Sequence, residues 1–167
     1  RATVYAERRK INEGADVRAN VLRLVHEELD SLLENQLQGQ PEDWDLESLA
    51  REVSTIVPLG TNDSAVLDGL SSDEIAQSLQ AYADERYETR EKEFGPEAMR
   101  QMERLIMLGT IDQLWTAHLT EMDEMRQGIG LRAYGQGDPL VHYKKEAHDM
   151  YGQLMENIRG YVARSVY

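Results

Sequence analysis

The segment 127–139 is the part of the chain that most invites a chemical reading, because it carries four glycines within a short stretch. A loop that cradles phosphate needs a preceding strand and, in a P-loop, Gly-Lys-Ser/Thr at the start of the next helix. Here a helical pattern precedes the glycines, and Asp138-Pro139 places a carboxylate where phosphate would sit. We therefore expect a helix–helix turn. Its exposed Leu131, Arg132 and Tyr134 favour a contact surface at the tip over a plain connection.

Metal binding is the second chemistry that the residue types suggest. The chain has four histidines, but two of them, His142 and His148, are six positions apart and so lie on different faces of a helix. Acidic residues surround His118, yet no histidine stands four positions from it, as a helical zinc pair requires. We expect no metal site. His26, His118, His142 and His148 should instead be solvated or lie at the edge of the hairpin.

Catalysis, disulfides and nucleic-acid binding find little support. No carboxylates stand out as a general acid–base pair, and no Ser or Thr lies in a nucleophile motif. With no cysteine, the chain has neither disulfides nor thiolate metal ligands. A net charge of −13 argues against nucleic acid, which binds basic faces. No apolar run approaches the roughly 20 residues of a membrane-spanning helix, so we expect no transmembrane segment.

Two long helices would position the glycine-rich turn. Apolar residues recur at steps of three and four throughout, which predicts an all-α protein. The strongest pattern begins at Pro96 and reaches about Gln127, where Gly128-Ile129-Gly130 is expected to end the helix. A second helix begins at Pro139 and continues past Tyr161, and its packed apolar stripe is expected to run from Leu140 to Tyr161. The two should form a long antiparallel hairpin, whose core is predicted to contain Leu108, Ile111, Trp115, Leu119, Met122, Tyr143, Met150 and Leu154.

The first half of the chain predicts shorter helices. A short helix over Thr3–Glu13 is followed by one that Asp16 caps and that ends near residues 39–41. Another covers roughly Leu46–Val53. A last one starts at a capping box of Ser71 and Glu74 and continues to about Phe94, where Gly95-Pro96 interrupts it. Residues 30–94 hold 16 acidic and 4 basic side chains, so 12 of the 13 net negative charges lie there. This acidic surface is either simply solvated or keeps the region away from acidic partners and lipids.

Seven methionines offer another open alternative. They could line a promiscuous apolar groove, because Met side chains adapt to many shapes. At helical spacing they more often form ordinary hairpin core, which is the interpretation favoured here. The groove interpretation leads to a second function, a free-standing helical adaptor that dimerises through these faces without enzymatic activity.

The hairpin sequence resembles the SecA family. The resemblance rests on Leu-Trp-Thr-Ala-His-Leu at 114–119, on the run from Met122 to Leu140, and on Tyr-Lys-Lys-Glu at 143–146. In SecA such a run forms the two-helix finger. Residues 4–10 resemble the end of the long scaffold helix, and segments 42–45 and 87–93 resemble the helical wing. Ala133 stands where the family commonly has Gly, and Gly109 where a long side chain is usual.

The resemblance implies a division of the chain and a role. Residues 1–14 would end the scaffold helix, 15–95 would form a small helical wing, and 96–167 the hairpin. The chain would be a region of a SecA-type preprotein translocase motor, with no catalytic site or cofactor of its own. ATP and Mg²⁺ would bind in ATPase domains outside it, and Arg1, which is not preceded by Met, would lie inside a longer polypeptide.

Partners and site residues also follow from the resemblance. The partners would be a SecY-type channel, a secretory preprotein and the motor's own ATPase domains. The location would be cytoplasmic, peripheral to the cytoplasmic face of the bacterial inner membrane. Tyr134 would grip the moving polypeptide at the tip of the finger. The residues expected to contact polypeptide or channel are Leu131, Arg132, Tyr134, Gly135 and Gln136.

Overall fold

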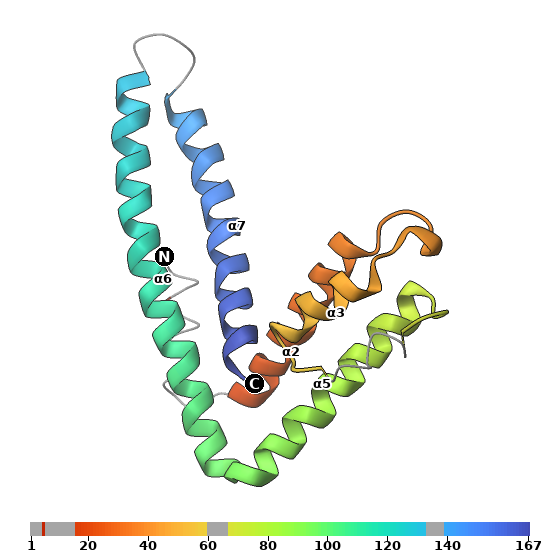
Figure 1. The fold of residues 1–167 in the computed structure, drawn as a ribbon. Helices are drawn as coiled ribbons and strands as arrows, with labels where there is room; N and C mark the ends of the chain where they lie inside the picture. Colours follow the sequence, from red (N-terminus) through yellow and green to blue (C-terminus); the bar gives the residue numbers. More distant parts are fainter. Residues whose placement is uncertain (1–4, 6–15, 60–66, 133–138) are drawn as a thin grey trace.

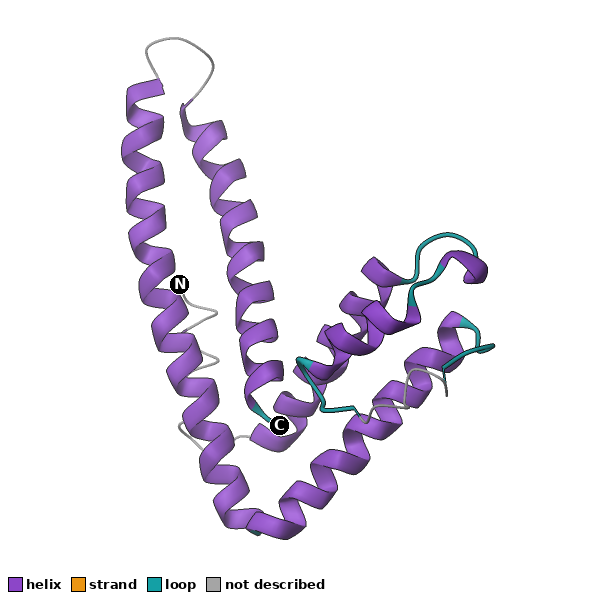
Figure 2. Cartoon of the chain, viewed as in Figure 1, coloured by secondary structure: helices purple, strands orange, loops and turns teal. Residues whose placement is uncertain are grey.

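The protein is all-α, as the sequence pattern predicts. The computed structural model describes residue 5 and residues 16–59, 67–132 and 139–167, with the backbone alone for 129–132 and 139. Within these ranges all regular secondary structure is helical (Figure 2). The elements are α2 (Val17–Gln36), the short 3-10 helix η1 (Pro41–Asp43), α3 (Leu46–Ser54), α5 (Ser72–Phe94), α6 (Pro96–Arg132) and α7 (Pro139–Ser165).

The described helices form two arms that meet in a V (Figure 1). One arm is the long antiparallel hairpin of α6 and α7, and the other consists of α2, α3 and α5. α2 holds the arms together, because it contacts α7 and α6 on one side and α5 and α3 on the other. The carboxyl end of the chain lies at the junction, beside α2.

Two helix starts that the sequence predicts are confirmed. The Asp16 carboxylate accepts a hydrogen bond from the Ala19 backbone N–H at 3.1 Å, which caps α2. The Ser71 hydroxyl accepts one from the Glu74 N–H at 3.2 Å, which caps α5. α5 then runs to Phe94, where the predicted interruption occurs. The predicted helix over 3–13 lies outside the described residues except at position 5, which is helical.

The predicted end of the first hairpin helix is wrong. α6 does not stop at Gln127 but continues through Gly128-Ile129-Gly130 to Arg132. A glycine lowers helix stability by about 1 kcal/mol relative to alanine, but it keeps its N–H and so leaves the hydrogen-bond ladder intact. α6 therefore ends five positions later than expected.

One hydrophobic core extends through both arms. It includes Val21 and Leu29 of α2, Tyr87 of α5 and Met99 of α6, each almost completely buried. Because α2 belongs to the same cluster as the hairpin, the boundary predicted near residue 95 separates elements that share a core. The boundaries at 14 and 95 stay predictions.

The inner stripe of α7 differs from the one expected at both ends. Tyr161 is 54% exposed and Leu140 57% exposed, although both were placed on the packed face. Near its carboxyl end α7 meets α2 as well as α6, and its buried face becomes Ile158, Val162 and Val166, at steps of four. That shift turns Tyr161 outward.

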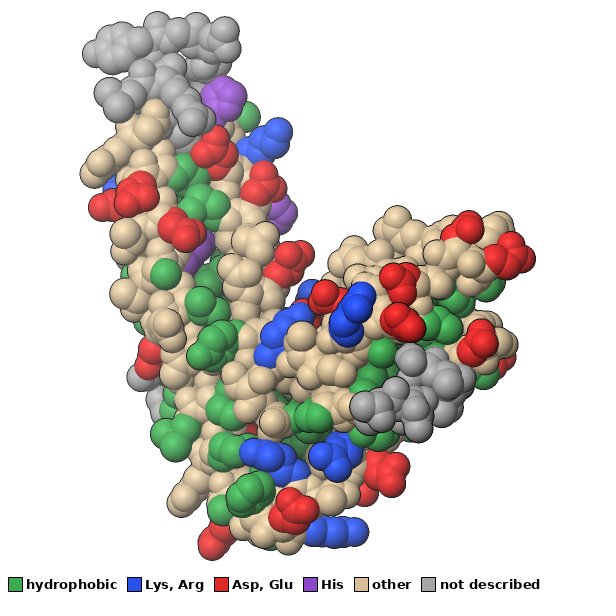
Figure 3. Space-filling view, in the orientation of Figure 1, with side chains coloured by type: hydrophobic (Ala, Val, Ile, Leu, Met, Phe, Trp, Pro, Cys, Tyr) green, Lys and Arg blue, Asp and Glu red, His purple; other side chains and the backbone are tan. Residues whose placement is uncertain are grey.

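Charge is unevenly distributed over the face shown in Figure 3. Acidic side chains follow both arms, whereas many of the Lys and Arg side chains gather around the junction of the arms. Four arginines near the junction pair with carboxylates of neighbouring helices: Arg18, Arg100, Arg159 and Arg164.

Candidate functional site

The predicted hairpin core divides into a packed part and a looser part. Ile111, Trp115 and Leu154 are buried, and Leu108 and Leu119 pack half-buried against the same cluster. All of them except Leu119 lie on the half of the hairpin, residues 96–118 with 154–165, that packs against α2. A third helix therefore supports the predicted core along this half.

Further from the junction the core residues are less enclosed. Met122, Tyr143 and Met150 are half-buried. Met122 and Tyr143 line a cleft of about 340 Å³ between α6 and α7, together with Asp123 and Arg126. The two helices thus leave space between them here instead of interlocking fully.

The predicted contact residues lie at the far end of this hairpin. Leu131 and Arg132 form the last two positions of α6, so they extend the rod instead of belonging to the turn. Tyr134, Gly135 and Gln136 lie outside the described residues. Their role stays a prediction, and the hairpin geometry places the ends of both flanking helices at the tip of the arm (Figure 1).

His118 is not solvated, so the first of the two alternatives expected for the histidines is wrong for this residue. It is 7% exposed and stacks on Trp115 with ring centroids 5.3 Å apart. Tyr5 packs edge-on against the same indole, at 6.0 Å. Burial lowers the pKa of His118, which favours the neutral ring. No group of three or more His, Asp or Glu among the described residues is arranged to hold a metal ion.

Two of the methionines are unavailable as a binding groove. Met99 and Met107 are buried in the chain's own core. Met122, Met125 and Met150, on the looser half of the hairpin, are half-buried. Met102 and Met155 are half-buried and pack against the same core. The core interpretation therefore holds for the four methionines nearest the junction, and among the other three Met122 lines the cleft between α6 and α7.

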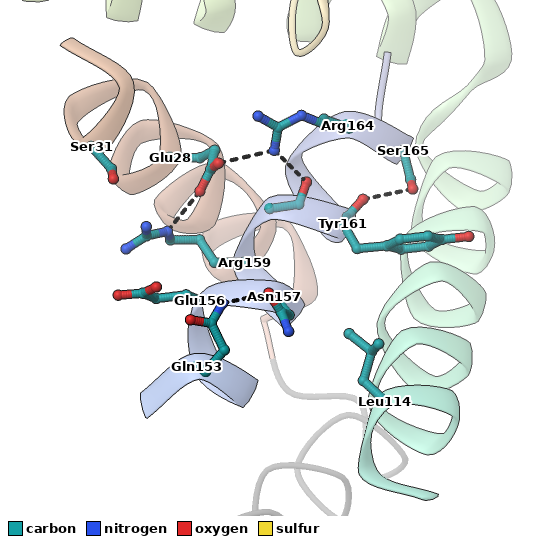
Figure 4. A pocket seen from close by; sticks show the side chains of 11 residues that line it. Glu28, Ser31, Leu114, Gln153, Glu156, Asn157, Arg159, Tyr161, Arg164 and Ser165 are labelled. Carbon is teal, nitrogen blue, oxygen red and sulfur yellow. Dashed lines mark hydrogen bonds and ion pairs between the residues drawn. The ribbon is translucent and has the colours of Figure 1, made fainter. Parts of the chain in front are cut away.

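An ion-pair cluster joins α2 to the end of α7 (Figure 4). The Glu28 carboxylate of α2 accepts hydrogen bonds from Arg159 Nε at 2.8 Å and Arg164 Nη1 at 2.9 Å. Burial alone would raise the pKa of Glu28, but the bonds and charges of the two arginines outweigh it and lower the pKa. Arg164 Nη1 also donates to the Gly160 carbonyl at 3.1 Å. Gly160 has no side chain, which leaves room for this guanidinium.

The same cluster borders an open cleft of about 730 Å³ between the arms. Tyr161 of α7 and Leu114 of α6 face each other on its hairpin side (Figure 4). Glu28 and Ser31 line it from α2. Polar and charged residues make up most of its lining, and three of the charged ones, Glu28, Arg159 and Arg164, are paired with one another.

A second cluster lies at the elbow where α5 meets α6. Tyr87 and Glu91 of α5 lie opposite Arg100 and Glu103 of α6, and Arg18 of α2 reaches the same place. Glu103 is fully buried, and burial raises its pKa to about 7. Arg100 Nε lies 3.2 Å from its carboxylate in an ion pair, at an angle unsuited to a hydrogen bond.

Comparison with known proteins decides the family. A family model described as the SecA Wing and Scaffold domain matches residues 1–167. The chain belongs to the SecA wing and scaffold family. The resemblance seen in the hairpin sequence is thereby confirmed for the whole chain.

Curated relatives carry the SecA name. The chain is 41% identical over 169 residues to the protein translocase subunit SecA of Dehalococcoides mccartyi, and all of it aligns. It is 41% identical over 167 residues to SecA 1 of Thermobifida fusca and 38% identical over 159 residues to SecA of Cutibacterium acnes, each covering 95% of the chain. The chain spans 17–18% of the length of these relatives. It is therefore a SecA-like translocase motor part.

The SecA wing and scaffold region contains two features that sequence reasoning missed. The ion-pair clusters at Glu28 and at Glu103 join residues that are far apart in the chain, up to 136 positions for Glu28 and Arg164. A weak signal existed at the elbow, where Tyr87 and Glu91 precede Gly95-Pro96 by one or two turns and Arg100 and Glu103 follow it.

Every helix in the described part of the chain is too short or too polar to span a bilayer.

Proposed function

We propose that this SecA wing and scaffold chain works as the lever of a preprotein translocase motor. In this proposal the α6–α7 hairpin carries motion from the ATPase domains to a secretory polypeptide in a SecY-type channel. The strongest support is the family match over residues 1–167, combined with a long hairpin whose far end stands clear of α2. Such a rod can transmit displacement only if its base is firmly held, and the core around Trp115 and Leu154 supplies that hold.

The chemical step belongs to other domains in this proposal. ATP and Mg²⁺ bind in ATPase domains outside this chain, and the chain contributes no catalytic residue and binds no cofactor. The motor works on the cytoplasmic face of the bacterial inner membrane, attached peripherally through the channel. We expect the 167-residue chain alone not to hydrolyse ATP, and turnover in a clean preparation would contradict that expectation.

The tip residues make the contact with the polypeptide. Tyr134 is the central one, because an aromatic ring can press on many kinds of side chain without demanding a sequence. Leu131, Arg132, Gly135 and Gln136 surround it in the sequence and complete the surface offered to polypeptide and channel. A mechanical grip of this kind suits a motor whose substrates share no sequence.

Photo-crosslinking tests the tip contact directly. A photoreactive amino acid replaces Tyr134 in the full-length protein that carries this chain, and a secretory polypeptide is stalled in transit. A matched control places the same group at Glu47, an exposed position of α3 in the other arm. We expect adducts with the polypeptide from position 134 and none from position 47. Equal yields, or none from the tip, would overturn the contact.

A second test separates grip from nucleotide binding. Tyr134→Ala in the full-length protein removes the ring but leaves the described helices untouched. We expect transport to fall strongly while the affinity for ATP stays within error of the unmodified protein. Normal transport by this variant would count against Tyr134 as the gripping residue.

A further inference from the structure

The elbow between α5 and α6 is a joint of one residue. α5 ends at Phe94 and α6 begins at Pro96, so only Gly95 lies between the two helices. Gly95 has φ 86° and ψ 150°, a conformation that residues with a side chain rarely adopt. The direction of α6 relative to α5 therefore depends on one pair of backbone dihedral angles. A small change in these two angles would move one arm of the V relative to the other.

Side chains on both sides of this joint are tied together by Arg100. Its Nη2 donates to the Tyr87 hydroxyl at 3.0 Å and to Glu91 Oε2, both on α5, although Arg100 itself belongs to α6. The Tyr87 hydroxyl in turn donates to Glu103 Oε1 on α6. The hydrogen bonds therefore cross the joint in both directions. Tyr87 and Glu103 are fully buried, so water cannot readily replace their partners.

α2 fixes the same cluster from a third side. Arg18 Nε donates to Glu91 Oε2 at 3.2 Å, and the Arg18 guanidinium lies 5.4 Å from the centre of the Tyr87 ring. α2 also contacts α7, so a helix that grips the hairpin base holds the elbow as well. The three helices are thus joined at one partly buried cluster of charged groups.

We propose that Arg100 is a positioning residue that sets the angle between α5 and α6 and so couples the wing arm to the hairpin. The coupling role rests on the lever function proposed above, whereas the angle does not. The planar guanidinium offers several donors in a fixed fork, so one side chain serves both Tyr87 and Glu91. A lysine ammonium at this position supplies the charge but not the fork.

The distance between the two arms measures the angle. Because the chain has no cysteine, Asp73→Cys and Glu124→Cys introduce two unique sites for spin labels. Both positions are exposed, one at the start of α5 and one on the outer half of α6. Pulsed electron paramagnetic resonance then gives the distribution of distances between the arms. Asp73→Cys with Glu88→Cys, both on α5, is a pair whose distance the elbow does not affect.

Variants at Arg100 should widen or shift the distribution between the arms. We expect this for Arg100→Met and also for Arg100→Lys, because the fork and not the charge holds the joint. The matched control is Arg23→Met, which breaks an exposed pair with Glu27 on α2. Arg23→Met should leave the distribution unchanged, and the pair within α5 should be unchanged in every variant.

Tyr87→Phe keeps the test decisive where Arg100→Met fails to fold. It retains the buried ring and removes only the hydroxyl that links Arg100 to Glu103, and we expect a smaller broadening. A distribution identical to that of the unmodified chain in folded Arg100→Lys and Tyr87→Phe would overturn the proposal, whatever happens to the melting temperature. The measurement needs neither ATP nor a channel, so its result is independent of the Tyr134 experiments.

Discussion

The two halves of the hairpin are built differently. The base, residues 96–118 with 154–165, packs against α2 and contains buried side chains such as Met107, Trp115 and Ile158. The distal arm, residues 119–132 with 139–153, has no buried side chain among those that the structure describes. Two helices alone can bury only the faces they turn to each other, whereas a third helix encloses the seam.

This difference teaches how one hairpin can be both anchored and exposed. The base obtains its stability from long-range packing and from ion pairs to α2. The distal arm relies on helix propensity and on one partly open contact face. In the lever proposed above, the tip would therefore sit on a pair of helices that local openings affect first, while the anchored base stays fixed.

The largest expected effect comes from comparing two substitutions one turn apart on α7, one in each half of the hairpin. Leu154→Ala in the base should cost about 4 kcal/mol of unfolding free energy, because it leaves a cavity in a core that three helices enclose. Met150→Ala in the distal arm should cost about 1 kcal/mol, because its side chain is only half-buried. Urea unfolding of the chain measures both. Equal losses would break the distinction between base and arm.

The next effect is a change in how the unfolding free energy depends on pH, and it comes from Glu103 in the base. The pKa of Glu103 is raised to about 7, above its value in the unfolded chain, so the folded state binds the proton more tightly. Its contribution to stability is fully present below about pH 4.5 and is lost as the pH rises through 7. The change is on the order of 3 kcal/mol. Glu103→Gln should flatten the fall in unfolding free energy between pH 5 and pH 7.

Glu28→Gln is the control of opposite sign. The pKa of Glu28 is lowered, so its contribution is present above the unfolded pKa and is lost as the pH falls. Glu28→Gln should therefore change the unfolding free energy at acid pH and leave its fall between pH 5 and pH 7 in place. A Glu103→Gln profile parallel to that of the unmodified chain across this range would refute the assignment.

The smallest effect comes from replacing two glycines of the base with alanine. The comparison separates the gain in helix propensity from the cost of packing. A Cβ at Gly109 would meet nothing within 4 Å, so Gly109→Ala should stabilise the chain by about 1 kcal/mol. A Cβ at Gly160 would lie 3.0 Å from Arg164 Nη1 and 3.4 Å from Glu28 Oε1. Gly160→Ala should therefore gain less or lose stability. Thermal melting of both variants checks the order, and a larger gain at Gly160 would contradict it.

The sequence predicted the features that local chemistry determines. Caps at Asp16 and Ser71 and first-turn prolines at Pro96 and Pro139 marked helix starts correctly, because each acts within one turn. Stripes at steps of three and four identified the all-α class and the hairpin. The predicted stop at Gly128 failed because a glycine weakens a helix without removing a hydrogen bond.

Features that depend on tertiary contacts escaped prediction. The spacing of three residues already places His118 beside Trp115 on one helix, but the burial of its ring depends on tertiary packing. Tyr161 was misplaced because α7 changes its packing partner near its carboxyl end. The elbow cluster needs Arg18 and Glu91, which are 73 positions apart, to meet. The predicted tip residues at 134–136 lie outside the described part of the chain, so their role depends on the experiments at Tyr134.

Native-state hydrogen exchange of the 167-residue chain tests the contrast between base and arm most directly. Amides of the base, around Met107 to Trp115 and Leu154 to Val162, should exchange only through global unfolding. Amides of the distal arm, around Leu119 to Arg126 and Tyr143 to Met150, should exchange through local openings of lower free energy. Equal protection along the whole hairpin, following the global unfolding free energy at every position, would contradict the account.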